Sequence, residues 1–161
     1  MRAFSIWSFA LLLLVIPLTS ACEKTITHNA NGTLNVQTSM TQQELQSAIQ
    51  SSLADPLITS LTVQLQSGYI LVTARRQRVN DASRTDTLAF RLDLAVSNGH
   101  LTASVSNAQL DGAAVEQSRV NVWNQTIASR LEKLGQRHPN AALQSVVVTP
   151  DSLTMTWQVT Q

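Results

Sequence analysis

Cys22 is the residue whose type and position point most directly to a specific chemistry. It is the only cysteine in the chain of 161 residues, so no intramolecular disulfide can form. A thiol can act as a nucleophile, bind a metal or carry a covalent lipid. The three histidines (His28, His100 and His138) have no partner at metal-ligand spacing, and the sequence contains no glycine-rich phosphate loop. We therefore predict no catalytic site, no metal site and no cofactor, and we expect that the protein is not an enzyme.

The residues before Cys22 have the layout of an export signal. Arg2 supplies a positive charge, 10–16 is an apolar run, Pro17 breaks it, and Thr19-Ser20-Ala21 are small. The uncharged stretch is about 20 residues long, close to the length that spans a bilayer. However, it ends in small and polar residues, and no Lys or Arg cluster follows it. The pattern predicts a cleaved signal peptide over residues 1–21.

The segment Leu18-Thr19-Ser20-Ala21-Cys22 resembles the lipobox of bacterial lipoproteins. Thr19 departs from the family pattern, in which leucine is usual three residues before the cysteine. The resemblance implies that a lipid is attached to the Cys22 thiol, which anchors the protein to a membrane on the extracytoplasmic side of the cell envelope. Glu23 is not the aspartate that retains such proteins in an inner membrane, which favours the outer membrane. The alternative is an ordinary secreted protein with a chance cysteine.

Cleavage would leave a chain with the size and charge of one neutral domain. We expect a lipidated tether over 22–32 and a single α+β domain over 33–161. Removal of Arg2 reduces the 11 Lys and Arg residues to 10, which balance the 10 Asp and Glu residues. A nucleic-acid partner would require a concentrated basic face, so we expect none.

Apolar residues alternate along several stretches that are separated by turn signals. The clearest runs from 88 to 105 around Asn98-Gly99, and a second surrounds Ser67-Gly68. A last pair of strands is predicted over 143–148 and 153–159. Strict alternation predicts strands with one buried face and one solvated face.

Two segments carry apolar residues at helical spacing. Thr41 and Glu44 form a capping box before the first helix, and Asp55-Pro56 ends it. The second helix is predicted over about 115–136. Its apolar stripe consists of Val120, Trp123, Ile127, Leu131 and Leu134. Together these elements predict the α+β class, with a curved antiparallel sheet of long hairpins and two amphipathic helices packed on one of its faces.

The order of these elements, with the closing segment 143–153, resembles small bacterial lipid-binding domains of the tubular (BPI-like) superfamily, of which the LmeA-like group is the nearest. The resemblance covers roughly 33–161 at the level of pattern, without an invariant motif. It implies an acyl chain held between a helix and a strongly curved sheet. The candidate ligand-binding residues are Leu45, Ile49, Leu53, Phe90, Leu92 and Leu94. The alternative is that these residues simply pack on one another as core.

A cluster of arginines is the other candidate site. Arg75, Arg76 and Arg78 could contact anionic headgroups, although a solvated loop or strand extension at one end of the molecule is the simpler explanation. We therefore expect a membrane-anchored envelope lipoprotein that binds or transfers a lipid or another hydrophobic ligand. The alternative function is a non-enzymatic interaction or assembly lipoprotein, with a closed core, that docks on another envelope protein.

Overall fold

A computed structural model describes residues 24–28, 33–136 and 139–159 of the chain. The predicted signal peptide, Cys22 and His138 lie outside these residues. The described part is α+β, with two helices and a majority of residues in strands, as the alternating patterns predicted.

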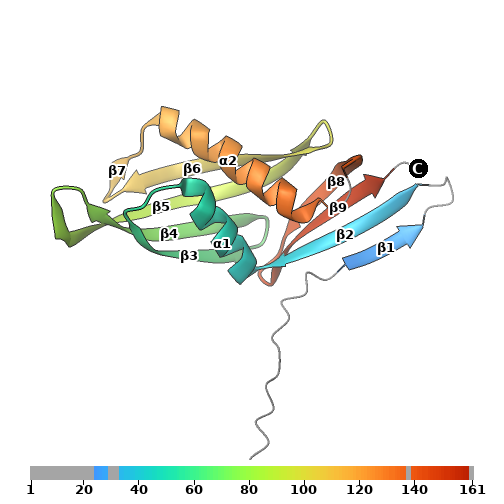
Figure 1. Cartoon of the computed structure of the whole chain (residues 1–161), viewed down its shortest axis with the longest axis horizontal. Helices are drawn as coiled ribbons and strands as arrows, with labels where there is room; N and C mark the ends of the chain where they lie inside the picture. The colour runs from blue at the N-terminus through green and yellow to red at the C-terminus, as the bar shows by residue number, and fades with distance from the viewer. Residues whose placement is uncertain (1–23, 29–32, 137–138, 160–161) are drawn as a thin grey trace, which may run out of the picture.

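The strands form two antiparallel sheets, whereas the sequence patterns predicted one. In spatial order, the four-stranded sheet contains β1 (Lys24–His28), β2 (Leu34–Thr41), β9 (Ser152–Val159) and β8 (Ala141–Val148). The five-stranded sheet contains β3 (Ile58–Gln66), β4 (Tyr69–Arg78), β5 (Asp81–Ser97), β6 (His100–Leu110) and the short β7 (Ala113–Ala114). The sheets follow one another along the long axis of the molecule (Figure 1).

Two predicted turns join the sheets. The N–H of Gly68 donates to the carbonyl of Val148 at 3.0 Å, and the N–H of Leu143 donates to the carbonyl of Gly99 at 2.8 Å. Asn98 and Gly99 both have positive φ, as a tight two-residue hairpin turn requires. The tips of both long hairpins therefore rest against β8, the outer strand of the other sheet.

The helices form where the sequence predicted them. Helix α1 (Gln42–Leu53) begins with the capping box: Glu44 N–H donates to Thr41 Oγ1 at 3.3 Å, and Thr41 N–H donates to Glu44 Oε2 at 2.8 Å. Helix α2 (Gln117–Gly135) starts above the five-stranded sheet and ends near the four-stranded sheet (Figure 1). Both helices thus cover one side of the molecule, and α2 spans the junction of the sheets.

Two details differ from the sequence-based expectation, and a third decides between two alternatives that it left open. Lys24–His28 pairs with β2 as a strand, in a segment that has no periodicity of its own. The arginine-rich segment after Ala74 extends β4 to Arg78, which is the strand extension predicted as the alternative to a loop. Leu134 was expected in the apolar stripe of α2 but is 41% exposed, because the neighbouring Gly135 is the residue that faces β9.

Candidate functional site

The apolar residues predicted to bind a ligand lie in the hydrophobic core. Leu45, Ile49 and Leu92 are 0% exposed, Leu53 and Phe90 are also buried, and Leu94 packs against them half-buried. They belong to one continuous cluster with buried residues of both helices and both sheets. The structure thus gathers the predicted residues, but it surrounds them with other core side chains.

Trp123 shows how this face is filled. Its ring stacks on that of Phe90, with centroids 5.7 Å apart and an interplanar angle of 28°. Trp123 is buried at 6% exposure, so α2 covers the part of the sheet face that carries Phe90. Aromatic packing therefore occupies space that an acyl chain beside Phe90 would need.

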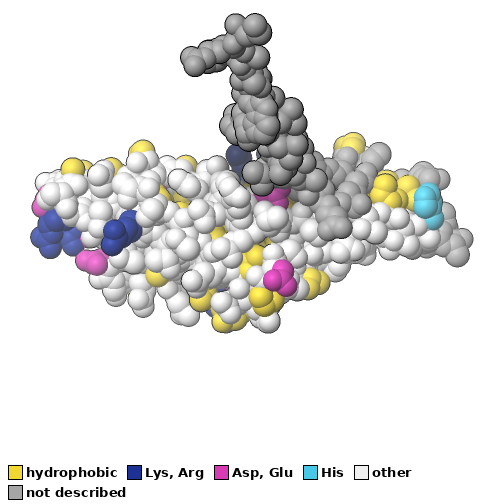
Figure 2. Space-filling view, turned by 90° about the horizontal axis from the view of Figure 1, so that it is seen from below, with side chains coloured by type: hydrophobic (Ala, Val, Ile, Leu, Met, Phe, Trp, Pro, Cys, Tyr) yellow, Lys and Arg dark blue, Asp and Glu magenta, His cyan; other side chains and the backbone are white. Residues whose placement is uncertain are grey.

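The arginine cluster lies at one end of the molecule, at the β4–β5 hairpin (Figures 1 and 2). Arg76 Nε donates to Asp55 Oδ2 at 2.7 Å. Arg78 Nε donates to Asp86, and its Nη2 donates to Asp111 Oδ2 at 3.0 Å. Arg75 is exposed, and strand alternation places it on the opposite face from Arg76. The three cations predicted to bind headgroups are therefore divided between two faces, and carboxylates already bind two of them.

Asp55 links the end of α1 to β4. Besides Arg76, its carboxylate accepts from the N–H of Leu57 at 3.0 Å. Burial raises the pKa of Asp55, but the hydrogen bonds from Arg76 and Leu57 and the charges of Arg76 and Arg119 lower it more strongly. The net result is a pKa below the ordinary value of 3.8, so folding favours the charged carboxylate.

We expect this carboxylate to make stability depend on pH in the acidic range. Its stabilising contribution is complete above the unfolded-state pKa and is lost as pH falls from about 4 through the lowered folded-state pKa. Urea unfolding of the wild type and of Asp55→Asn should therefore differ at pH 6 and converge toward pH 2. Asp151→Asn, in the exposed β8–β9 turn, is the control. An Asp55→Asn deficit that is equal at both pH values would contradict the assignment.

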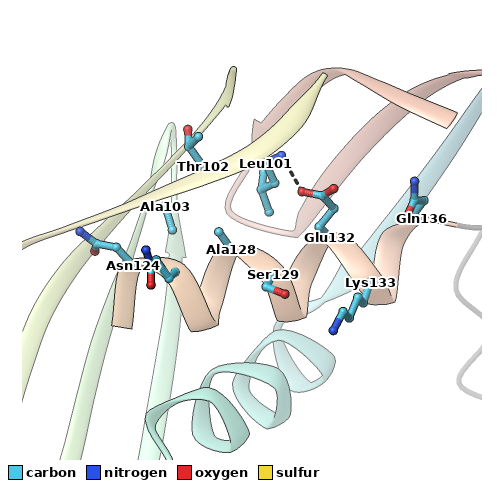
Figure 3. A pocket seen from close by; sticks show the side chains of 10 residues that line it. Leu101, Thr102, Ala103, Asn124, Ala128, Ser129, Glu132, Lys133 and Gln136 are labelled. Atoms are coloured by element: carbon cyan, nitrogen blue, oxygen red, sulfur yellow. Dashed lines mark hydrogen bonds between the residues drawn. The ribbon is translucent and has the colours of Figure 1, made fainter. Parts of the chain in front are cut away.

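A cleft of about 480 Å³ lies between α2 and β6 (Figure 3). Two polar side chains of α2 bridge it at the strand edge: Asn124 Oδ1 accepts from Val105 N–H at 2.8 Å, and Glu132 Oε2 accepts from Leu101 N–H at 2.9 Å. His100 is exposed, and its Nδ1 lies 2.9 Å from Glu132 Oε1. These contacts satisfy backbone groups at the open edge of β6.

These edge contacts were not predicted from the sequence, although their spacing gives a signal. Asn124 and Glu132 are eight residues apart, about 12 Å along one face of a helix. Leu101 and Val105 are four residues apart, about 13 Å along a strand. Matching intervals of this kind become visible only when the helix and strand are known to be neighbours.

Within the residues that the structure describes, no group of three or more His, Cys, Asp and Glu side chains is placed to hold a metal ion. In the same residues, no helix is both long and apolar enough to cross a membrane. No protein-family model, curated protein or solved structure matches the chain.

Proposed function

We propose that the protein is a lipoprotein of the bacterial cell envelope, anchored through Cys22, whose domain acts by docking on another folded chain. In this proposal the lipid on Cys22 supplies membrane attachment, and the domain encloses no ligand and catalyses no reaction. The lipobox-like segment supports the anchor. The burial of Leu45, Ile49 and Leu92 at 0% exposure is the observation that supports docking over ligand binding.

The physical reason is that an acyl-binding groove needs more apolar surface than the core itself consumes. A ligand pocket leaves apolar side chains facing a cavity or solvent when it is empty. Here the side chains on the two facing layers cover one another, and Trp123 fills the space over Phe90. On the face shown in Figure 2, most of the described surface is white, the colour of backbone and of uncharged polar side chains.

Lipid binding remains a second candidate, because one cleft has a partly apolar lining. Leu101, Ala103 and Ala128 line the space between β6 and α2, and its volume lies within the range of about 300–1,000 Å³ typical of ligand pockets. An acyl chain there would lie between a helix and a sheet, as in the proteins that the sequence resembles. This candidate also needs the strongly curved sheet of long hairpins implied by the resemblance. Lys133 is the cation that lines this cleft, so it would contact a headgroup there.

Native mass spectrometry of the exported Cys22→Ser chain tests the choice between these functions. This substitution removes the thiol that would carry the anchor, so any lipid mass must belong to the domain. We expect the bare polypeptide mass, before and after incubation with phosphatidylglycerol vesicles. A co-purified phospholipid or fatty acid that Ala128→Trp displaces would instead establish the cleft under α2 as a lipid site.

The anchor itself is tested separately. Wild-type chain should incorporate labelled palmitate and sediment with membranes, whereas Cys22→Ser should incorporate no palmitate. An unlabelled wild type would identify an ordinary secreted protein.

A further inference from the structure

The outer strands of the two sheets differ in how their free edges are covered. The outermost strand β7 pairs only with Gln109 and Leu110 of β6, and the edge of β6 beyond it is bonded by Asn124 and Glu132 from α2. The edge of β8 is bonded by Gly68 and Gly99 of the hairpin turns. β1 is five residues long. β3 has nine residues and pairs only with β4 among the described strands.

The composition of β3 does not protect this edge. Natural edge strands are usually blocked by charged residues, by proline, by bulges or by short length. Ile58–Gln66 contains no charged residue, no proline and no glycine, and its bulge lies at one end, between Ile58 and Ser60. Figure 2 views the molecule from the side on which β3 lies in Figure 1, and most of the surface shown there is white, the colour of backbone and uncharged polar side chains.

The pairing with β4 determines which backbone groups point outward. Gln66 and Tyr69 flank the two-residue turn and face each other, so they form the closing hydrogen-bonded pair of the hairpin. Alternate residues back along β3 therefore bond to β4. The N–H and C=O groups of Leu61, Val63 and Leu65 point to the free edge.

Leu61, Val63 and Leu65 form a symmetric pattern, Leu-Val-Leu, in either chain direction. An antiparallel second copy centred on Val63 would place Val63 opposite itself and Leu61 opposite Leu65 of the other chain. All three side chains are on the buried face of the sheet, so apolar residues would meet apolar residues. On the solvated face, Thr62 would face Gln64 of the other chain without a charge conflict.

We infer that the β3 edge is a self-association surface, which pairs antiparallel with β3 of a second copy and joins the two five-stranded sheets into one. This rests on the proposed docking function and identifies the docking partner as the same chain. About six main-chain hydrogen bonds would form. The two-fold pairing occupies the one free β3 edge of each chain, so assembly stops at a dimer. The coverage of β6 and β8 keeps those edges from extending it.

Disulfide trapping in the full-length chain tests the contact and its register. Two differently tagged chains, one Thr62→Cys and one Gln64→Cys, are co-expressed and exported. In the inferred dimer these positions form a non-hydrogen-bonded pair with Cβ atoms about 5 Å apart, near the separation of a disulfide. We expect a covalent heterodimer on non-reducing gels.

The matched control uses the residues directly opposite on β4. Thr73 and Leu71 face Thr62 and Gln64 respectively, and all four side chains are exposed. A Thr73→Cys and Leu71→Cys pair would be separated by about three strand spacings, or 14 Å, and should not link. The wild-type chain measures any background from Cys22. Equal linking of both pairs, or linking of neither, overturns the inference.

A charge experiment tests the same edge without cysteines. T62K/Q64K places like charges opposite one another across the pair, and we expect self-association to weaken at least tenfold. Mixing it with T62E/Q64E should restore a mixed dimer. Unchanged self-association of T62K/Q64K overturns the inference. A monomeric wild type without bound lipid would refute the dimer and leave the closed-core docking function in place. A dimer that carries phospholipid would support the dimer and contradict the closed core.

Discussion

Ile49→Ala is expected to lower the free energy of unfolding by about 2–5 kcal/mol, measured by urea denaturation of the exported Cys22→Ser chain. Ile49 is 0% exposed in the middle of α1, so truncation removes apolar contacts and leaves a cavity that its neighbours fill only partly. In an open ligand groove the same truncation would cost far less, because solvent already reaches the side chain there. The size of the change therefore reports directly on the closed core.

The control for Ile49→Ala is Val122→Ala. Val122 lies on α2 and is 56% exposed, so its truncation should change stability by no more than about 0.5 kcal/mol. A loss below about 1 kcal/mol for Ile49→Ala would contradict the closed core and favour the lipid-binding candidate.

Trp157→Ala should lower the free energy of unfolding by about 3–5 kcal/mol, because it removes a buried side chain of the four-stranded sheet. Trp157 is 1% exposed on β9, and its Nε1 donates to Thr38 Oγ1 of β2 at 3.1 Å. Its ring also faces Gly135 at the end of α2, where an added Cβ would come within 3.2 Å of Trp157 Cζ2. The side chain therefore holds together two strands and the helix that spans both sheets.

Gln158→Ala is the comparison for Trp157→Ala. Gln158 is the next residue, on the opposite face of β9, and its hydrogen bonds to Gln144 and Thr33 are long, at 3.4 and 3.5 Å. We expect its loss to change stability by less than about 1 kcal/mol. Both variants should unfold in one transition by tryptophan fluorescence and by far-UV circular dichroism. Separate transitions would mean that the four-stranded sheet unfolds independently.

Local sequence patterns determined the secondary structure of the protein. The capping box of α1 involves Thr41 and Glu44, three residues apart, and the turn at Asn98-Gly99 is set by two residues that tolerate positive φ. Alternation and helical periodicity likewise act over a few residues. These signals are contained in the segment that they shape, so the α+β class and nearly all elements followed from the sequence.

Tertiary structure alone decided which faces meet and which edges stay open. The apolar pattern that includes Ile49 and Leu92 is compatible with a core or with a groove. Periodicity indicates that a face is shielded from water, but it does not indicate whether protein or ligand covers that face. The joining of the two sheets depends on contacts of Gly68 and Gly99 with a strand 40 or more residues away in the chain. The charges of Arg76 and Arg78 are likewise bound by carboxylates that only the fold brings near. The outer edge of β3 is free because, among the described strands, only β4 lies beside β3, on its other side. Such outcomes depend on long-range packing, which no short stretch of sequence encodes by itself.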